Sequence, residues 1–330
     1  MSTNTYTNPT LLDIVQRQNP QGGIDVQVAE MMSKTNEIID EMTMVECNDG
    51  TTHLSTIRTG LPAGAWRKLN YGVPSEKSQT IQVRDGVGML ESYGEIDAKL
   101  AKINGNSAGW RLTEESAFIE GLGQTMAATL MYGDTDTNPE RFLGIAPRYD
   151  LTTAGNGDNI ILGGSADTDN TSIYLVGWSP STVFGLFPKG SPAGLRMTDL
   201  GEDTAVDSNG LKHQVLRTHF EWDLGFCVKD WRYIVRICNI EKSALLKDAA
   251  SGADLVDLMD QALEIVPRNS GVRWAFYCNR TISSFLRRQV SNKAKYQLTL
   301  ENFGGRPVTM FSGVPVRRVD AIVNNEALIA

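Results

Sequence analysis

The spacing of apolar residues changes several times along the chain, and each change predicts a different element. Residues 1–23 are polar apart from one short apolar cluster, which is typical of an arm. Over residues 25–44, apolar side chains recur every three or four positions, which predicts an amphipathic helix. Its apolar face, which includes Met31, Ile38 and Met42, must be buried. It packs either on its own domain or on a neighbouring subunit.

Residues 51–97 have the pattern of a two-stranded ribbon. Apolar positions predict one strand through Leu54 and Ile57 and a second through residues 81–89. The connecting loop contains Trp66-Arg67-Lys68-Leu69-Asn70-Tyr71 and few apolar anchors. A two-stranded ribbon is marginally stable in water, so it needs another surface to lie on. That surface is either its own core or another copy of the chain.

A long helix is predicted over residues 113–132. Thr113 is its candidate N-cap, and the apolar residues that follow are spaced four apart as far as Gly133. About 20 residues at a rise of about 1.5 Å give a rod of roughly 30 Å. Such a helix is long enough to act as the spine of a domain.

The remaining pattern is mixed. Glycine and proline at residues 187–212 predict an exposed loop, and residues 213–240 alternate like a long antiparallel pair with a turn at Asp230-Trp231. A helix is expected over residues 253–266, with Asp254 and Asp257 in its first turn and Pro267 after its end. A strand, a helix over residues 281–290 and further strands complete the chain. The elements together predict the α+β class.

Composition narrows the possible functions. The chain has 330 residues, 41% of them hydrophobic, and a formal charge of −8, so it can form one large domain or two ordinary ones. An acidic balance argues against wrapping nucleic acid, and any contact with a genome should be weak and nonspecific. No apolar run reaches the roughly 20 residues of a membrane span. The N-terminus lacks the pattern of a secretory signal, which predicts synthesis in the cytoplasm.

Known catalytic patterns are missing from the sequence. There is no Gly-x-x-x-x-Gly-Lys-Ser/Thr loop and no Gly-x-Gly-x-x-Gly between a strand and a helix. The Asp134-x-Asp136-x-Asn138 segment begins like a calcium loop but has Pro139 where glycine is required. We therefore expect no catalytic residue, no cofactor and no metal. Four cysteines without Cys-x-x-Cys spacing predict buried free thiols, at positions Cys47, Cys227, Cys238 and Cys278.

Two polar clusters allow alternative interpretations. His213, His219, Glu221 and Asp223 share the parity of one strand face, so a metal site is geometrically possible, although no recognised ligand spacing supports it. A basic cluster surrounds the helix over residues 281–290. It could contact nucleic acid, but sparse aromatics and the negative net charge favour a solvated face or pairing with acidic residues of another copy. The basic cluster consists of Arg280, Arg287, Arg288, Lys293 and Lys295.

The last sixty residues carry a family resemblance. Their landmarks, in order, are Gly271, Trp274, Phe276, Asn279, Phe285, Gly305-Arg306-Pro307-Val308, Phe311, Gly313-Val314-Pro315-Val316, Asp320 and Glu326. This order resembles the C-terminal part of tailed-bacteriophage major capsid proteins with the HK97-like fold. The resemblance extends over nearly the whole chain. It implies an N-terminal arm at 1–50, an extended E-loop hairpin at 51–98, a peripheral domain with the spine helix at 99–150 and 307–330, and an axial domain at 151–306, with part of 213–240 assignable to the peripheral domain.

The resemblance also implies a function. It predicts a structural virion protein that assembles with itself, as hexamers and pentamers, into an icosahedral shell around packaged double-stranded DNA. A separate scaffolding protein, a decoration or cement protein and the portal are the possible partners; a membrane is not. Assembly is expected in the cytoplasm of a bacterial host, with the protein ending in the virion capsid. The intersubunit contact candidates are Trp66, Arg67, Lys68, Leu69 and Tyr71 in the loop and Met31, Ile38 and Met42 in the arm.

Departures from the best-known member refine this prediction. No long helical extension precedes the arm, so an internal scaffolding segment is not expected. Lys68 and Lys77 lie in the loop, but no acceptor for a covalent cross-link can be assigned, so we expect noncovalent stabilisation. Two alternatives remain from the sequence alone. One is a metal-dependent enzyme with a site near His213 and His219, and the other is a tail or sheath protein.

Overall fold

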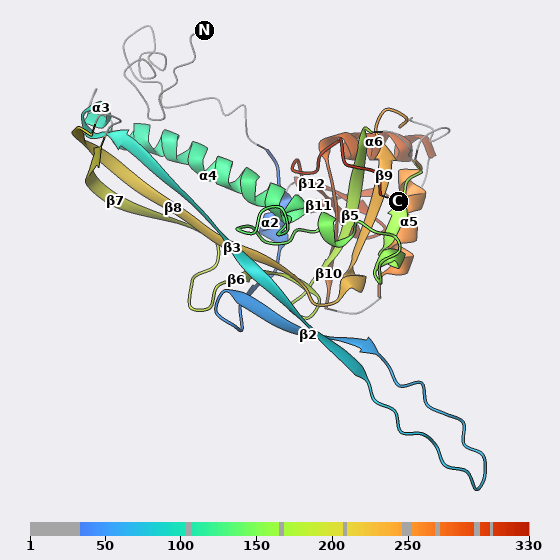
Figure 1. Ribbon diagram of the computed structural model, residues 1–330. Coiled ribbons are helices and arrows are strands. Elements are labelled where there is room, and N and C mark those ends of the chain that lie inside the picture. The colour runs from blue at the N-terminus through green and yellow to red at the C-terminus, as the bar shows by residue number, and fades with distance from the viewer. Residues whose placement is uncertain are drawn as a thin grey trace. The chain divides into compact units, whose positions relative to one another are not determined.

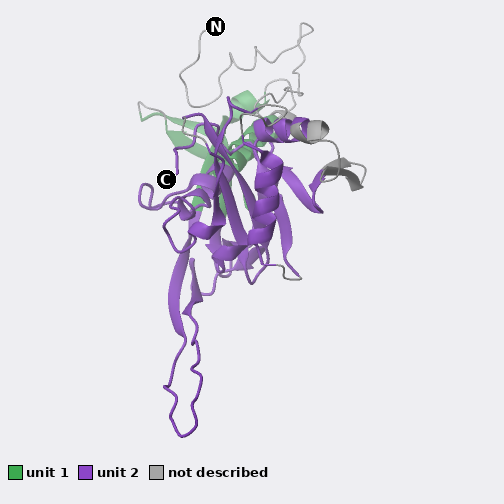
Figure 2. Cartoon of the chain, turned by 90° about the vertical axis from the view of Figure 1, so that its right-hand side faces the viewer, with its two compact units in different colours: residues 1–34, 89–126, 194–223 green, residues 35–88, 127–193, 224–330 purple. Residues whose placement is uncertain are grey.

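The computed structural model describes residues 34–102, 107–164, 168–206, 210–245, 253–267, 271–293, 298–303 and 306–329. Met31 and the rest of the predicted arm up to residue 33 lie outside the described residues. The chain divides into two compact units, coloured separately in Figure 2. Unit 1 is Met1–Lys34, Met89–Met126 and Gly194–Asp223; unit 2 is Thr35–Gly88, Ala127–Ala193 and Leu224–Ala330. The predicted domain boundaries stay a prediction, because these units group residues by contact alone.

Most of the sheet belongs to unit 2 (Figure 2). Its strands follow the order β11-β12-β13-β10-β5-β6-β8-β3-β2, with β1 beside β6 and β9 between β4 and β5. The strands are β1 (Met44–Glu46), β2 (Thr52–Gly60), β3 (Gln79–Asp97), β4 (Ile160–Leu162), β5 (Asn170–Trp178), β6 (Val183–Phe187), β8 (Lys212–Val228), β9 (Ile234–Glu241), β10 (Arg273–Cys278), β11 (Leu298–Phe303), β12 (Arg306–Phe311) and β13 (Val314–Arg318). Short 3-10 helices are η2 (Ala146–Arg148), η3 (Gly157–Asn159) and η4 (Trp231–Tyr233).

The main core of unit 2 forms around β5 and β9. All nine residues of β5 are buried, as expected for a central strand with neighbours on both sides. Helices α5 (Leu255–Ile265) and α6 (Arg280–Lys293) contribute the other side of this core. Asp254 caps α5 by accepting a hydrogen bond from the Asp257 amide, and Leu255 and Met259 are fully buried. The predicted helix over residues 253–266 is confirmed.

Unit 1 contains a long ribbon and part of a long helix. Strand β7 (Leu195–Val206) pairs antiparallel with β8, from Leu195 opposite Trp222 to Val206 opposite Lys212. Helix α3 (Ala98–Lys102) follows β3 and contributes Leu100 to a small apolar cluster. Helix α4 (Ser107–Tyr132) begins in unit 1 and ends in unit 2. A stacked ring pair, with centroids 5.4 Å apart, joins Phe118 of α4 to Phe220 of β8.

Two predictions about strands were wrong. Residues 187–212 are not only a loop, because they contain β7. That strand is almost entirely exposed, so it lacks the apolar alternation by which strands are recognised in a sequence. The proposed pair within residues 213–240 does not form either: β8 pairs with β3, β6 and β7, whereas β9 pairs with β4 and β5. Both strands pair with segments that are distant in the sequence and not with each other across the local turn.

Two helix boundaries also differ from the predictions. Helix α4 starts six residues before Thr113, at Ser107, but it ends at Tyr132 as predicted. Gly133 is required there, since a Cβ at that position would lie 2.3 Å from the Phe142 carbonyl oxygen. The predicted helix over residues 25–44 was wrong at its end. In the described part, α2 (Glu37–Glu41) stops at an extended Met42, and the chain then pairs with β6 through β1.

Candidate functional site

The candidate site is the hairpin of β2 and β3 in unit 2. It extends away from the rest of that unit in Figure 1. The strands pair antiparallel from Thr52 opposite Gly86 to Gly60 opposite Gln79, with a register irregularity beside Gly60. Residues 61–78 connect them without regular structure apart from a turn at residues 69 and 70. The predicted ribbon and its connecting loop are confirmed, and β3 runs eight residues beyond the predicted residue 89.

A buried ion pair holds the base of this hairpin. Asp85 of β3 is 6% exposed, and its Oδ1 accepts a hydrogen bond of 2.7 Å from Arg148 Nη2. The same nitrogen also donates to the carbonyl oxygens of Leu143 and Phe226. A guanidinium group that serves three acceptors fixes β3 against the body of unit 2. Sequence reasoning missed this pair, because neither residue lies in a recognisable motif and 63 positions separate them.

The backbone at the base is close-packed as well. A Cβ on Gly225 would lie 2.6 Å from the Gly86 carbonyl oxygen, so only glycine permits this approach of β8 to β3. Asn48 makes two hydrogen bonds to the backbone of Leu54, of 2.8 and 2.9 Å. One end of the hairpin is therefore firmly held by side chains and by backbone contact.

The other end has no comparable packing. Every residue from 61 to 82 is exposed. Trp66 is 103% exposed and Leu69 is 91% exposed. The described contacts at the tip are local: Arg67 Nε donates to the Tyr71 carbonyl oxygen at 3.1 Å, and the Gly64 amide donates to Glu76 at 2.9 Å. These bonds shape a bend but bury no apolar surface.

All five loop candidates lie on this exposed segment. Its large apolar side chains include two that the sequence analysis did not select, Leu61 at 77% and Val73 at 48% exposed. Their apolar character within an exposed, glycine- and proline-containing loop was the signal available. An isolated large apolar side chain on a surface is ordinary, but five exposed on one loop favour contact with a partner. The five are Leu61, Trp66, Leu69, Tyr71 and Val73.

The candidates from the arm are placed differently. Ile38 is fully buried in unit 2, and Met42 is 6% exposed. Met42 packs beside β6, where a Cβ on Gly185 would lie 2.8 Å from the Met42 sulfur. Of the two alternatives given by the sequence, packing on the chain's own domain is the one that holds for these two side chains. In this conformation neither is available for a contact with another subunit.

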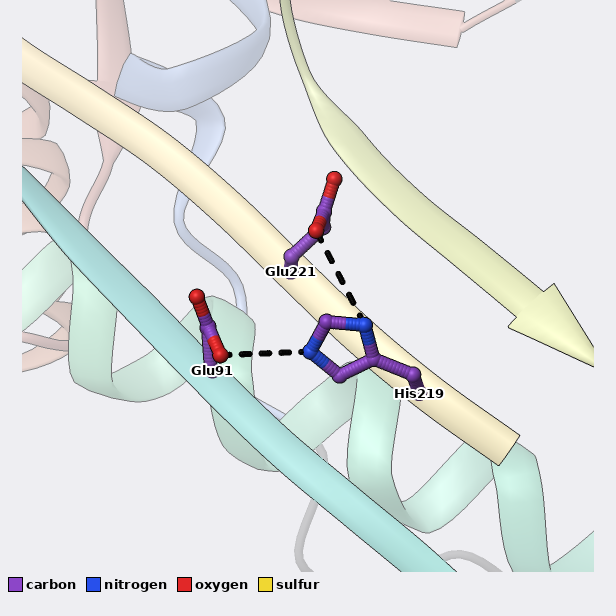
Figure 3. Close-up of side chains that lie close together, drawn as sticks. All are labelled: Glu91, His219 and Glu221. Carbon is purple, nitrogen blue, oxygen red and sulfur yellow. Dashed lines mark hydrogen bonds and ion pairs between the residues drawn. The ribbon is translucent and has the colours of Figure 1, made fainter. Parts of the chain in front are cut away.

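The histidine cluster forms only in part. In unit 1, His219 lies between Glu91 and Glu221, with Nε2 3.2 Å from Glu91 and Nδ1 3.7 Å from Glu221 (Figure 3). Among the described residues, His213 and Asp223 do not belong to the cluster. The two carboxylates approach different ring nitrogens, whereas one ion would take a single nitrogen. Tyr93 stacks on the His219 ring at 4.4 Å, and Arg196 pairs with Glu221. The arrangement suits hydrogen bonding between β3 and β8.

The four cysteines are free and buried, as predicted. Burial raises the pKa of the Cys238 thiol to about 11 and that of Cys278 to about 12. Neutral, enclosed thiols are poor nucleophiles and poor metal ligands. In the described parts of the chain, no helix has the length and apolar character needed to cross a membrane.

Comparisons with known proteins agree with one another. The sequence profile of a family described as major capsid protein GP7 matches residues 19–330. A chain in the structure of bacteriophage Epsilon15 matches with a TM-score of 0.79 and 34% identity, covering 100% of this chain and 99% of that one. A chain of the bacteriophage JBD30 capsid matches with a TM-score of 0.52 and 9% identity, over 88% and 92% of the two chains, which speaks for the fold alone. Among curated proteins, none matches the sequence.

Proposed function

This chain belongs to the family of the major capsid protein GP7, and from that premise we propose that it assembles as hexamers and pentamers into an icosahedral shell around packaged double-stranded DNA. The predicted family and the α+β, HK97-like capsid fold are confirmed by the family match and the structural matches. Its role is therefore structural, and its place is the capsid of a virion. Neither an enzyme nor a tail or sheath protein is needed to account for the chain.

The observation that carries the proposal is the asymmetry of the β2–β3 hairpin. Its base is fixed by the buried Asp85–Arg148 pair, whereas its tip exposes five large apolar side chains. An arm that cannot bury its own apolar surface is stabilised when another copy covers it. We assign the tip, with Trp66 and Leu69 at its centre, to a contact with a neighbouring subunit.

Closed symmetry then turns modest contacts into a stable shell. Each copy would both extend one hairpin and receive one, so the number of contacts grows with the number of subunits. Once several contacts involve the same subunit, later contacts form at a high effective concentration. A separate scaffolding protein, a decoration or cement protein and the portal are proposed as further partners, and the cytoplasm of a bacterial host as the place of assembly.

Sedimentation velocity on the purified chain, over a range of protein and salt concentrations, tests the proposal. Particles of narrow size in the megadalton range are expected, and electron microscopy should show closed shells. Tubes in place of shells would contradict icosahedral closure. A monomer that persists when lysate of cells expressing the remaining virion proteins is added would contradict self-assembly.

A further inference from the structure

A groove of about 720 Å³ in unit 2 is lined by an unusual excess of arginine. Five arginines and one acidic residue, Glu37, contribute to its walls, although the chain as a whole carries a formal charge of −8. Helix α6 forms one wall and strand β13 another. The arginines are Arg280, Arg287, Arg288, Arg317 and Arg318.

The wall contributed by α6 is a continuous polar stripe. Its side chains belong to residues 280, 283, 284, 287 and 288, which share one helix face by their three- and four-residue spacing. The opposite face is apolar and buried, with Ile282 at 0% and Leu286 at 1% exposed. No aspartate or glutamate occurs in the whole helix. The stripe therefore lacks the alternating charges of an ordinary solvated helix face, where acidic and basic residues pair.

Carboxylates of the described residues form ion pairs with three of the groove arginines. Asp320 pairs with Arg318 at 2.5 Å and lies 3.4 Å from Arg280. Glu41 pairs with Arg317 at 2.5 Å, and Glu37 is 3.5 Å from the same guanidinium group. Among the side chains that the structure describes, these three carboxylates lie beside Arg280, Arg317 and Arg318.

Further hydrogen-bond donors lie along helix α6. The Arg288 guanidinium group lies over the Phe285 ring, with 5.0 Å between the guanidinium carbon and the ring centroid. Arg287 donates to Thr309 Oγ1 at 3.2 Å. Ser283 and Ser284 add hydroxyl donors between the arginines. In protein–nucleic acid complexes, phosphate oxygens accept hydrogen bonds from guanidinium and hydroxyl groups such as these.

We propose that this arginine groove binds the phosphate backbone of double-stranded DNA, without reading its sequence. From residue 280 to residue 288 the stripe is about 12 Å long, because a helix rises about 1.5 Å per residue. That length spans about three to four nucleotides at the 3.4 Å rise of one DNA strand. That the bound DNA is a packaged genome rests on the proposed function; the binding itself does not.

An acidic segment of a second copy is a less suitable occupant. The sequence contains no run of three consecutive acidic residues that could match an extended arginine stripe. The sequence has three pairs of adjacent acidic residues, and each contains a residue that already pairs with a cation: Glu41 with Arg317, Glu115 with Arg111, and Glu202 and Asp203 with Lys102 and Arg217. A repeating phosphate backbone supplies the dense, evenly spaced negative charge that the stripe requires.

Fluorescence anisotropy of a labelled 20-base-pair duplex of mixed sequence tests the proposal on the full-length chain, with sodium chloride as the variable. We expect Arg287→Gln/Arg288→Gln to weaken binding at least tenfold at 0.1 M salt and to reduce the log–log salt slope by about 1.8, which corresponds to two lost phosphate contacts. Arg58→Gln/Arg141→Gln is the matched control, since both of its arginines are exposed outside the groove and the net charge changes equally. It should leave the slope unchanged.

Three results would overturn the proposal. The first is an unchanged slope in the groove variant, and the second is an equal loss in the control, which would indicate long-range charge alone. The third is normal DNA binding together with impaired assembly of the groove variant, which would assign the groove to a neighbouring subunit. Sedimentation of each variant shows separately whether shells still form. A variant that loses DNA binding but forms shells contradicts neither proposal, whereas a control variant that binds DNA but forms no shells bears on assembly alone.

Two further experiments keep the proposal testable if the first groove variant fails to fold. Arg280→Gln/Arg288→Gln keeps the Arg287–Thr309 hydrogen bond and removes two exposed guanidinium groups instead. Phenylglyoxal modification of the unaltered chain, read by mass spectrometry, needs no variant. Duplex DNA should slow modification of Arg287 and Arg288 severalfold and leave Arg58 unaffected; equal rates with and without DNA would refute the site.

Discussion

At the scale of single residues, the most informative group is a buried network of hydrogen bonds and an ion pair that no local sequence pattern predicts. Arg236 and Glu326 form an ion pair of 2.8 Å, with each side chain 5% exposed. Arg236 also donates to the carbonyl oxygens of Ala146 and Tyr149, and the Tyr132 hydroxyl donates to Glu326 at 2.5 Å. The pair thus ties the end of the chain to β9 and to the end of α4. Burial, together with Glu326, raises the pKa of Tyr132, which keeps its hydroxyl protonated as a donor.

Arg236→Ala should destabilise the chain by about 3–5 kcal/mol, because it leaves the Glu326 carboxylate buried without its cation. Urea unfolding followed by circular dichroism measures the loss. Arg232→Ala is the matched control: its ion pair with Asp230 is partly exposed and should contribute less than about 1 kcal/mol. Equal losses in the two variants would show that the buried network has no special role.

The buried Cys278 thiol contributes to the response of the folded chain to alkaline pH. Burial raises the pKa of Cys278 to about 12 from an ordinary value of 9.0. Below pH 9 the thiol is protonated in both states, and its contribution to stability is fully present. Above pH 9 only the unfolded chain loses the proton, so the free energy of unfolding falls by about 1.4 kcal/mol per pH unit as the pH approaches 12. Cys278→Ala should show a shallower decline of the urea midpoint between pH 9 and pH 11. Identical slopes would contradict this account.

At the scale of elements, helices were easier to predict than strand partners. The end of α4 and the whole of α5 follow from periodicity, a cap and a stop residue, all of which act within a few positions. Strand β7 and the partners of β8 and β9 do not. A strand is stabilised by whichever segment lies beside it, and that segment can be a hundred residues away. The hairpin is the intermediate case, since its two strands are neighbours in the sequence.

Trp66→Ala should impair assembly far more than folding. Trp66 buries nothing within the chain, so its removal should leave the thermal unfolding midpoint of the monomer unchanged. If the side chain contributes about 2 kcal/mol to an intersubunit contact, the protein concentration needed for assembly rises about 30-fold. Light scattering during assembly measures this threshold.

Leu151→Ala, which truncates an exposed apolar side chain outside the hairpin, is the control for Trp66→Ala. It should leave both the assembly threshold and the unfolding midpoint unchanged. A normal threshold for Trp66→Ala would remove the hairpin tip from the contact, whereas a large drop in its unfolding midpoint would show an unseen role in folding.

At the scale of the whole molecule, the charge distribution matters more than its total. A formal charge of −8 suggested only weak contact with DNA, yet arginines from α6 and β13 line one groove. The helix face was visible in the sequence as a basic cluster. The second wall was not, because Arg317 and Arg318 join it only through the parallel pairing of β13 with β10.

Assembled shells should dissolve to a single band near 36.2 kDa in denaturing gel electrophoresis. Lys68 and Lys77 are exposed on the hairpin loop, but we expect the contacts made there to be noncovalent. Shells treated with glutaraldehyde provide the control and should give a ladder of higher bands. A ladder in untreated shells would demonstrate a natural cross-link.

The sequence by itself determined the class of the protein, the existence and order of its main helices, the ribbon of β2 and β3 with its connecting loop, and the burial of its thiols. These depend on local periodicity and on the chemistry of single side chains. Only the tertiary structure decided that Ile38 and Met42 are core residues, that Asp85 and Glu326 have buried arginine partners, and that two separate segments build one basic groove. Such contacts join positions far apart in the chain, and their energy appears only once folding has removed water from both partners.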